Sequence, residues 1–382
     1  MLCDSNLCTG CLSCYNACAF GAIRLVEDAM GVLHPTVDQE RCRNCGKCEA
    51  LCPVLHPPKA ARPLKARALY ARDEENRKRS SSGGVAYTLY CRVLGEGGAV
   101  FGTGFDERGM PGLCAAQTKA DLEDFRGSKY VYAHPGLVYR EVEQALKQGK
   151  QCLFIGTPCQ VAALRAYLKT DQENLITVDL VCHGTPPQAY LMQHLVHRTN
   201  DSAIGSLRFR GERGYQLDAY DRAQKRIFSR RANQDLYYTA FLQGLNMRKI
   251  CYSCPYAGEQ RVSDITIGDF WGLAKDALNG YSGRVSLALS NTERGERFLN
   301  AARELFCVQE RTVEEAVAGN DQLRAPTPRN ARRATFERVY CATGDFRKAA
   351  RACGVGRDIR HTRIRNKLFA LPRFVKHRVL KK

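Results

Sequence analysis

The sequence predicts a small cysteine-rich α+β module, a larger mixed α/β domain after it, and a basic C-terminal tail. Eight of the 19 cysteines lie in two short runs before residue 53. From residue 65 to 325, apolar runs of strand length alternate with segments of helical length, which is the pattern of an α/β domain. Basic residues are concentrated near the end of the chain. We therefore expect domains at residues 1–57 and 65–325 and a helical tail at 326–382.

The cysteines of the first module repeat the spacing C-x2-C-x2-C-x3-C twice. The first run is Cys8, Cys11, Cys14 and Cys18, and the second is Cys42, Cys45, Cys48 and Cys52. This spacing is typical of bacterial two-cluster ferredoxins, in which three close thiolates bind one 4Fe-4S cluster and the fourth binds the other. We therefore expect Cys52 to complete the first cluster and Cys18 the second. A zinc module or a disulfide scaffold is the alternative, but neither run contains a His.

The other elements are predicted from apolar runs and turn residues. Short strands are expected at 23–26 and 33–37 in the dicluster ferredoxin module, and the Pro-rich residues 57–63 form a connector. In the α/β domain, strands are expected at 66–70, 99–105, 151–156, 175–182, 204–210, 263–268 and 284–289. Helices are expected at 85–94, 137–148, 160–168, 187–198, 235–245 and 293–306.

The composition indicates a globular protein in a reducing compartment. A chain of 382 residues can bury a large core, and 44% hydrophobic with 25% charged residues is ordinary for a soluble globular protein. The sequence has no apolar run of about 18 residues, so it predicts no transmembrane helix. The first residues also lack the pattern of a secretory signal. Because cluster thiolates must stay reduced, we expect a cytoplasmic protein.

The basic character belongs to the end of the chain. Residues 324–382 hold eighteen Lys and Arg against three acidic residues, which is +15 of the total formal charge of +19. Apolar residues recur there at helical spacing, namely Ile364, Leu368, Leu371, Val375 and Val379, although Pro372 should break such a helix. A basic amphipathic end favours weak contact with an anionic membrane or a partner groove over nucleic acid. A fully solvated tail is the alternative.

Two polar loops of the α/β domain carry candidate binding residues. Ser81, Ser82, Gly83 and Gly84 come directly before a predicted helix, where free backbone N–H groups would suit a diphosphate. An ordinary serine N-cap with a flexible loop before it is the alternative. The second loop, residues 127–130, is a polar turn that leads into an aromatic strand and is a weaker indication by itself.

Four later cysteines form a second group of candidate ligands. Cys159 opens the helix after one predicted strand, and Cys182 ends the next strand. Parallel strands end at the same edge of a sheet, so these two thiols are expected to be neighbours. With Cys251 and Cys254 they make four thiolates, the number that a third 4Fe-4S cluster needs. A redox pair, half of a zinc site, or small buried side chains are the alternatives.

Seven motifs in order resemble those of one known family. They are SSSGG (80–84), GGAVFGTGFD (97–106), GSKYV (127–131), GTPCQ (156–160), VDLVCHG (178–184), CxxC (251–254) and SDITIGDFWG (263–272). This succession strongly resembles the family of coenzyme F420 hydrogenase/dehydrogenase beta subunits over about residues 65–340. A ferredoxin-like front end is a usual attachment in that family.

The resemblance implies an iron-sulfur flavoprotein whose α/β domain is flavin-binding and carries FAD. The residues it implies as cofactor contacts are Ser81, Ser82, Gly83, Gly84, Ser128, Lys129 and Tyr130. It also implies that the four later cysteines hold a cluster beside the flavin. His183, next to Cys182, is a candidate proton donor, and a structural His is the alternative. Asp264, Asp269 and Trp271 either shape the substrate face or simply pack.

We therefore expect a cytosolic oxidoreductase that passes electrons between ferredoxin-linked 4Fe-4S clusters and FAD. Hydride transfer would be to or from a small organic substrate or a deazaflavin-type carrier. The alternative is an electron-transfer subunit of a larger hydrogenase or dehydrogenase, without a substrate of its own. A binding protein with structural clusters, and with its basic tail on nucleic acid, is the third and least favoured class.

Overall fold

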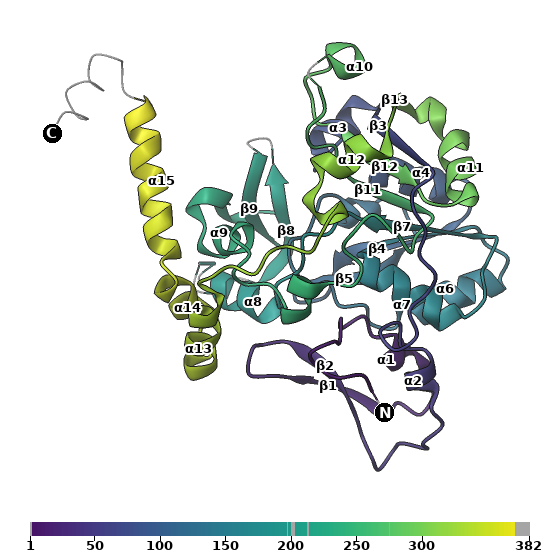
Figure 1. Cartoon of the computed structure of the whole chain (residues 1–382), viewed down its shortest axis with the longest axis horizontal. Helices are drawn as coiled ribbons and strands as arrows, with labels where there is room; N and C mark the ends of the chain where they lie inside the picture. Colours follow the sequence, from purple (N-terminus) through teal and green to yellow (C-terminus); the bar gives the residue numbers. More distant parts are fainter. Residues whose placement is uncertain (1, 197, 200–202, 212–213, 275, 371–382) are drawn as a thin grey trace.

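The computed structural model describes residues 2–196, 198–199, 203–211, 214–274 and 276–370 (Figure 1). A large mixed sheet forms the centre of the molecule, with strand order β13-β3-β12-β11-β7-β6-β4-β5. Its strands are β3 (Lys65–Ala71), β4 (Ala99–Phe105), β5 (Pro111–Ala116), β6 (Cys152–Gly156), β7 (Leu175–Leu180), β11 (Ile265–Asp269), β12 (Ser286–Ser290) and β13 (Phe306–Arg311). The four strands β4, β6, β7 and β11 are parallel, and the other neighbours pair antiparallel. The predicted mixed α/β class is confirmed.

Helices cover both faces of this sheet because the central strands are apolar on both sides. All five residues of β6 are buried, as expected for a parallel strand between two helical layers. Leu153 and Ile155 pack in one core with α4 (Val85–Gly95) and α11 (Glu293–Ala301). Cys152 and Phe154 pack in another core with α6 (Val138–Lys147) and α7 (Pro158–Leu168). The domain is therefore an α/β/α sandwich.

Several shorter helices complete this domain. They are α3 (Glu74–Arg79), α5 (Leu122–Phe125), α10 (Ala277–Gly280) and α12 (Val313–Gly319), with the 3-10 helices η2 (Lys249–Ser253), η3 (Arg303–Leu305) and η4 (Asp321–Leu323). Each predicted strand and helix of the domain is present within a few residues of its expected bounds. The strands β5 and β13 were not predicted.

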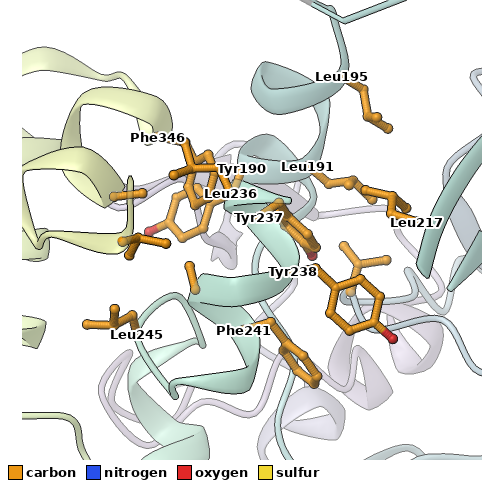
Figure 2. Close-up of a cluster of buried hydrophobic side chains, with 14 of the residues drawn as sticks. Tyr190, Leu191, Leu195, Leu217, Leu236, Tyr237, Tyr238, Phe241, Leu245 and Phe346 are labelled. Carbon is orange, nitrogen blue, oxygen red and sulfur yellow. The ribbon is translucent and has the colours of Figure 1, made fainter. Parts of the chain in front are cut away.

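A second, antiparallel sheet of order β10-β9-β8 projects beside the main one. Its strands are β8 (Ile204–Gly211), β9 (Gly214–Asp221) and β10 (Arg226–Arg231), and it packs with α8 (Gln188–Val196), η1 (Ala232–Gln234) and α9 (Leu236–Leu242). The shared core is rich in aromatic residues, including Tyr190, Tyr237, Tyr238 and Phe241 (Figure 2). Only β8 of this sheet was predicted.

The C-terminal helices are part of this second core. They are α13 (Arg333–Thr343), α14 (Phe346–Ala352) and α15 (Val355–Ala370). Phe336 and Phe346 are fully buried, and Ile359 of α15 is 8% exposed. The predicted tail is thus helical, but residues 333–359 pack into the body, and only the later part of α15 stands clear of it (Figure 1). Leu371, Pro372, Val375 and Val379 lie outside the described residues.

The cysteine-rich module is fixed against the body by hydrogen bonds. It contains α1 (Ser13–Ala17), α2 (Lys47–Ala50) and a hairpin of β1 (Ile23–Glu27) and β2 (Leu33–Val37), which was predicted. Tyr139 donates its hydroxyl to the Cys11 carbonyl at 2.8 Å, and Tyr190 donates to the Met30 carbonyl at 2.8 Å. Arg140 donates to the Cys18 carbonyl at 2.8 Å. The module is therefore seated on α6 and α8. No helix of the described segments has both the length and the hydropathy to span a bilayer.

Candidate functional site

Five cysteines from distant parts of the chain line one hollow at the edge of the main sheet. Four of them are Cys159, Cys182, Cys251 and Cys254, and the fifth is Cys11 of the cysteine-rich module. The hollow lies where β6 and β7 end, as the parallel-strand argument predicted. We call it the four-cysteine hollow, after the four thiols that the body contributes.

Local structure holds these thiols in place. Thr157 caps α7 and forms a capping box with Gln160, so Cys159 lies in the first turn of a capped helix. The Thr157 hydroxyl lies 3.2 Å from Cys159 Sγ. The backbone N–H of Gly184 donates to Cys182 Sγ at 3.4 Å. Such hydrogen bonds to sulfur are one of the means by which a protein tunes an iron-sulfur cluster.

The hollow does not favour free thiolates. Burial raises the pKa of Cys159 and of Cys182, and it raises the pKa of Cys254 to about 11, with neighbouring thiols adding to each shift. Thiols that stay protonated near neutral pH are poor nucleophiles. A bound metal centre reverses this, because its positive charge deprotonates coordinating thiols. The four thiols therefore fit a cluster better than a redox-active pair.

The first predicted quartet of the cysteine-rich module is also gathered. Cys8, Cys11, Cys14 and Cys52 line a smaller hollow together with Cys3. Burial raises the pKa of Cys11 to about 12. The backbone N–H of Gly10 donates to Cys8 Sγ at 3.4 Å. Cys3 lies outside the ligand pattern, and its position beside the quartet was not expected.

The second predicted quartet, Cys18, Cys42, Cys45 and Cys48, belongs to the outer part of the module. Cys45 is exposed and the other three are partly buried. Backbone N–H groups donate to Cys18 Sγ, from Ala22 at 3.2 Å, and to Cys42 Sγ, from Asn44 at 3.4 Å. In the described part of the chain, no three His, Cys, Asp or Glu side chains are arranged around a single-ion position. In a 4Fe-4S cluster each thiolate binds a different iron, so the thiols surround a cavity instead of meeting at one point.

A larger pocket opens beside the four-cysteine hollow. Its volume is about 230 Å³, against about 40 Å³ for the four-cysteine hollow, so it is the better fit for an organic group. The predicted residues that line it are Ser81, Ser82, Gly84, Ser128, Lys129, Tyr130 and His183. Gly83 does not line it. A Cβ there would lie 2.6 Å from the Leu69 carbonyl oxygen, so this glycine is needed for close packing of the loop on β3.

Arg210, which was not predicted as a site residue, connects several residues of the pocket wall. It donates to the Ser81 carbonyl at 2.7 Å and to the Tyr130 hydroxyl at 2.8 Å. It also pairs with Asp269 at 2.6 Å. Arg284 donates to the Ser80 carbonyl at 2.6 Å, which brings a second cation to the serine loop. This wall therefore places a guanidinium, paired with Asp269, beside the serine loop, and a guanidinium is a group that can bind a diphosphate.

Lys129 stabilises its own loop by hydrogen bonds. Its ammonium donates to the carbonyl oxygens of Thr103, Asp124 and Arg126, at 2.9, 2.5 and 3.1 Å. Burial lowers the pKa of Lys129 to about 7, whereas the three carbonyl acceptors favour its charged form. Because the ammonium already donates to these three carbonyl groups, the main role of Lys129 is to order its loop, and contact with a ligand is secondary.

The remaining candidates separate into pocket residues and packing residues. His183 lines the pocket, and burial lowers the pKa of its imidazole, so the ring is neutral near pH 7. Trp271 lines the pocket and is 45% exposed. Asp264 is fully buried and accepts from Thr177 and Arg294, so it is a packing residue that does not face a substrate.

The four-cysteine hollow and the larger pocket share a wall. Cys182 lines both, as do Thr157, Gln160 and Gly184. A group in the larger pocket would therefore lie next to the Cys182 thiol. Cys11 lines both the four-cysteine hollow and the smaller hollow of the first quartet, where the module meets the body. The three cavities thus lie side by side, from the module to the larger pocket.

Two parts of the chain match family models, and two curated proteins are similar to it. Residues 149–316 match the family model for the C terminus of the coenzyme F420 hydrogenase/dehydrogenase beta subunit, and residues 7–55 match a 4Fe-4S dicluster domain. An uncharacterized protein of Methanocaldococcus jannaschii is 25% identical over 53% of this chain and 65% of its own length. A subunit of the F(420)H(2) dehydrogenase of Methanosarcina mazei is 22% identical over 46% of this chain and 53% of its own length. The alignments thus span between about half and two thirds of these relatives.

One solved structure is also similar. It is a chain from the F420-reducing [NiFe] hydrogenase complex of Methanosarcina barkeri, with a TM-score of 0.47 and 19% identity. The match covers 76% of this chain and 91% of that one. Residues 7–55 of this chain are thus similar to a 4Fe-4S dicluster domain, and residues 149–316 are similar to the C-terminal domain of coenzyme F420 hydrogenase/dehydrogenase beta subunits.

Proposed function

We propose that this protein is an iron-sulfur flavoprotein oxidoreductase that moves electrons between 4Fe-4S clusters and FAD. One observation carries the proposal, namely that the four-cysteine hollow and the larger pocket share the wall formed by Cys182 and its neighbours. A cluster and a flavin bound there would be adjacent. When bound, FAD exchanges hydride with an organic molecule and single electrons with iron-sulfur clusters.

The chain's own residues supply the rest of the mechanism. The four thiols of the hollow would hold a third cluster. Arg210 and the serine loop would hold the diphosphate of FAD, and Arg284 would support the loop through the Ser80 carbonyl. His183 would offer a neutral imidazole at the pocket, which can donate a hydrogen bond to the substrate or accept a proton from it but is a poor proton donor near pH 7.

The exposure of the cysteines supports an order for the clusters. Cys45 of the second quartet is exposed, so that quartet would exchange electrons with a partner at the surface. Cys11 of the first quartet lines the four-cysteine hollow, so that quartet would be the next in line. Electrons would then pass through the hollow to the larger pocket, or in the reverse direction.

We propose a surface partner that is ferredoxin or a larger oxidoreductase. The name of the Methanosarcina mazei relative, a dehydrogenase subunit, favours a second candidate function, that of an electron-transfer subunit without its own substrate. Turnover of a small organic substrate or a deazaflavin-type carrier by the isolated chain would favour the first candidate. Stable co-purification with a large partner would favour the second. A reducing compartment such as the cytosol fits the many thiols.

The exposed part of α15 is a second candidate contact. Arg360, Arg363 and Arg365 are exposed there, and Ile364 is 58% exposed between them. We propose that this arm makes weak contact with an anionic membrane surface, because basic residues around an exposed apolar side chain suit such a surface.

The central test is the iron, acid-labile sulfide and flavin content of anaerobically purified protein. Three 4Fe-4S clusters require about twelve iron per chain, together with one FAD. Cys159→Ser should lower iron to about eight. Cys91→Ser is the matched control, because Cys91 lies on α4 and lines neither cavity. About eight iron in the wild type, no flavin and no effect of Cys159→Ser would overturn the proposal.

A further inference from the structure

Arg248 lies buried at the junction between the cysteine-rich module and the body. Its side chain donates to the Thr9 carbonyl of the module at 2.6 Å and to the Thr185 hydroxyl of the body at 3.2 Å. Its guanidinium lies over the Tyr132 ring, 4.5 Å from the ring centre. The residue is 6% exposed. Arg248 therefore connects the module and the body by hydrogen bonds to both.

Arg248 differs from the other buried arginines in having no carboxylate partner among the residues that the structure describes. Among the described residues, four arginines are buried, namely Arg67, Arg248, Arg261 and Arg333. The other three pair with Glu296 at 2.7 Å, Asp179 at 3.0 Å and Glu337 at 2.9 Å, respectively. A buried cation without a counter-charge is costly. The structure thus leaves a positive charge that needs an anion from another source.

Thiols of two predicted cluster sites lie around this charge. Arg248 lines the four-cysteine hollow with Cys11, Cys159 and Cys251. On the module side, the Thr9 carbonyl that accepts from Arg248 belongs to the residue that follows Cys8. When these thiols bind iron they are thiolates, and both clusters with their ligands are anionic. The required counter-charge would then be present on each side of Arg248.

The backbone of the cysteine-rich module leaves space for the Arg248 side chain at Gly10. Gly10 lies between Thr9 and Cys11 with φ of 66°, which favours glycine. A Cβ at Gly10 would overlap the Arg248 guanidinium. The Tyr132 hydroxyl donates to the Gly10 carbonyl at 2.6 Å and holds the segment against the body. The backbone beside two first-quartet ligands is therefore packed directly on Arg248.

We propose that Arg248 is the shared counter-cation of the first-quartet cluster and of the four-cysteine cluster, and that it raises the reduction potential of both. This inference rests on the proposed function, since it requires both clusters. A fixed positive charge stabilises the cluster form that carries the additional electron. Arg248 acts through the clusters and is therefore a positioning residue that contacts neither flavin nor substrate.

The test is a redox titration of the full holoprotein followed by EPR. Arg248→Gln keeps a hydrogen-bond donor toward Thr9 and removes the charge. We expect it to make reduction of the first-quartet and four-cysteine clusters at least tenfold less favourable, which for one electron is about 59 mV. The potential of the outer, second-quartet cluster should not change. Arg248→Lys, which keeps the charge, should restore most of both potentials.

Lys249→Met is the matched control. It removes the same charge one residue away, but Lys249 is exposed and its ammonium donates only to Asn6 in the described structure. Solvent screens that charge, so both potentials should stay near wild type. If Arg248→Gln holds twelve iron and both potentials are unchanged, the inference about Arg248 is wrong. It is also wrong if Lys249→Met shifts both potentials as much as Arg248→Gln does. Neither result would contradict the proposed function.

Two further outcomes are decisive. Eight iron in the wild type would overturn the inference and the proposed third cluster together. If Arg248→Gln fails to hold its clusters, Arg248→Lys decides the question, because the retained charge should keep both potentials within tenfold of wild type. A full tenfold loss in the Lys variant would overturn the inference.

Discussion

Ser81 and Ser128 are joined by a hydrogen bond of 2.8 Å, in which the Ser128 backbone N–H donates to Ser81 Oγ. The two residues come from loops that are 47 positions apart and were predicted separately as binding elements. Arg210 holds Ser81 from its other side, by donating to its carbonyl oxygen. One wall of the larger pocket is therefore held in place by hydrogen bonds among its own residues before any ligand binds.

We expect Ser81→Ala to weaken flavin binding. The substitution removes the acceptor and leaves the Ser128 N–H without its partner, which costs about 1 kcal/mol for a neutral hydrogen bond. That cost corresponds to roughly fivefold weaker binding of FAD, if the loop must be ordered in the complex. Titration of flavin-free protein with FAD measures the effect. Ser229→Ala, on an exposed position of β10, should bind as the wild type does. Equal affinities in all three proteins would contradict the prediction.

The order of the clusters predicts a difference between two cysteine substitutions. Cys45→Ser and Cys11→Ser should each lower iron by about four per chain. Reduced clusters that are close together broaden each other's EPR signals. Because Cys11 lines the four-cysteine hollow and Cys45 is exposed, the broadening of the third cluster should disappear in Cys11→Ser and persist in Cys45→Ser. The opposite pattern would mean that the second quartet is the inner one.

The central strands of the fold were predictable because they are buried on both faces. β6 and β7 are almost continuous apolar runs between turns, so their bounds in the sequence and in the structure agree closely. The position of Cys159 and Cys182 at the same edge follows from the parallel order of these strands. The serine loop was recognisable because its serines and glycines come directly before a helix.

The parts that were missed depend on contacts between distant residues. β5, β9, β10 and β13 are partly exposed strands whose sequences include Gly, Pro or charged residues, which weakens any strand pattern. Arg210 and Arg248 reach partners 129 and 239 residues away, and no local spacing reports such contacts. Residues 333–359 were predicted as part of a basic tail because they are rich in Arg, although Phe336 and Phe346 among them are buried in the core.

A buried ion pair of the main sheet gives a prediction for stability. Glu296 pairs with Arg67 at 2.7 Å, and the two side chains are 9% and 4% exposed. Glu296→Gln leaves a buried guanidinium with only Glu310 as a charged partner, so we expect a loss of about 3 kcal/mol in the free energy of unfolding. Urea unfolding followed by circular dichroism measures it. Glu74→Gln, which breaks an exposed pair with Lys78, should change stability far less, because solvent screens that pair.

The same pair predicts how this stability difference changes with pH. The hydrogen bond from Arg67 holds the pKa of Glu296 well below its ordinary value of 4.5. A carboxyl group with a lowered pKa contributes its full stabilisation above the ordinary pKa and loses it as pH falls through the folded value. The difference between wild type and Glu296→Gln should therefore be constant from pH 7 to about 5 and shrink below that. A difference that grows in acid would contradict this assignment.

The exposed arm of α15 predicts binding to anionic vesicles. Deleting the chain from residue 355 would remove Val355 and Ile359 from the core, so substitutions of exposed charges are the cleaner test. Replacing Arg360, Arg363 and Arg365 by Gln should weaken binding to phosphatidylserine vesicles about a hundredfold, at about 1 kcal/mol per basic residue. The matched control replaces Arg222, Lys225 and Arg226, which are exposed at the turn between β9 and β10. Equal losses in both triple variants would mean that net charge alone drives adsorption. Absence of vesicle binding by the wild type, with retention of an acidic protein, would show that the arm serves a protein partner.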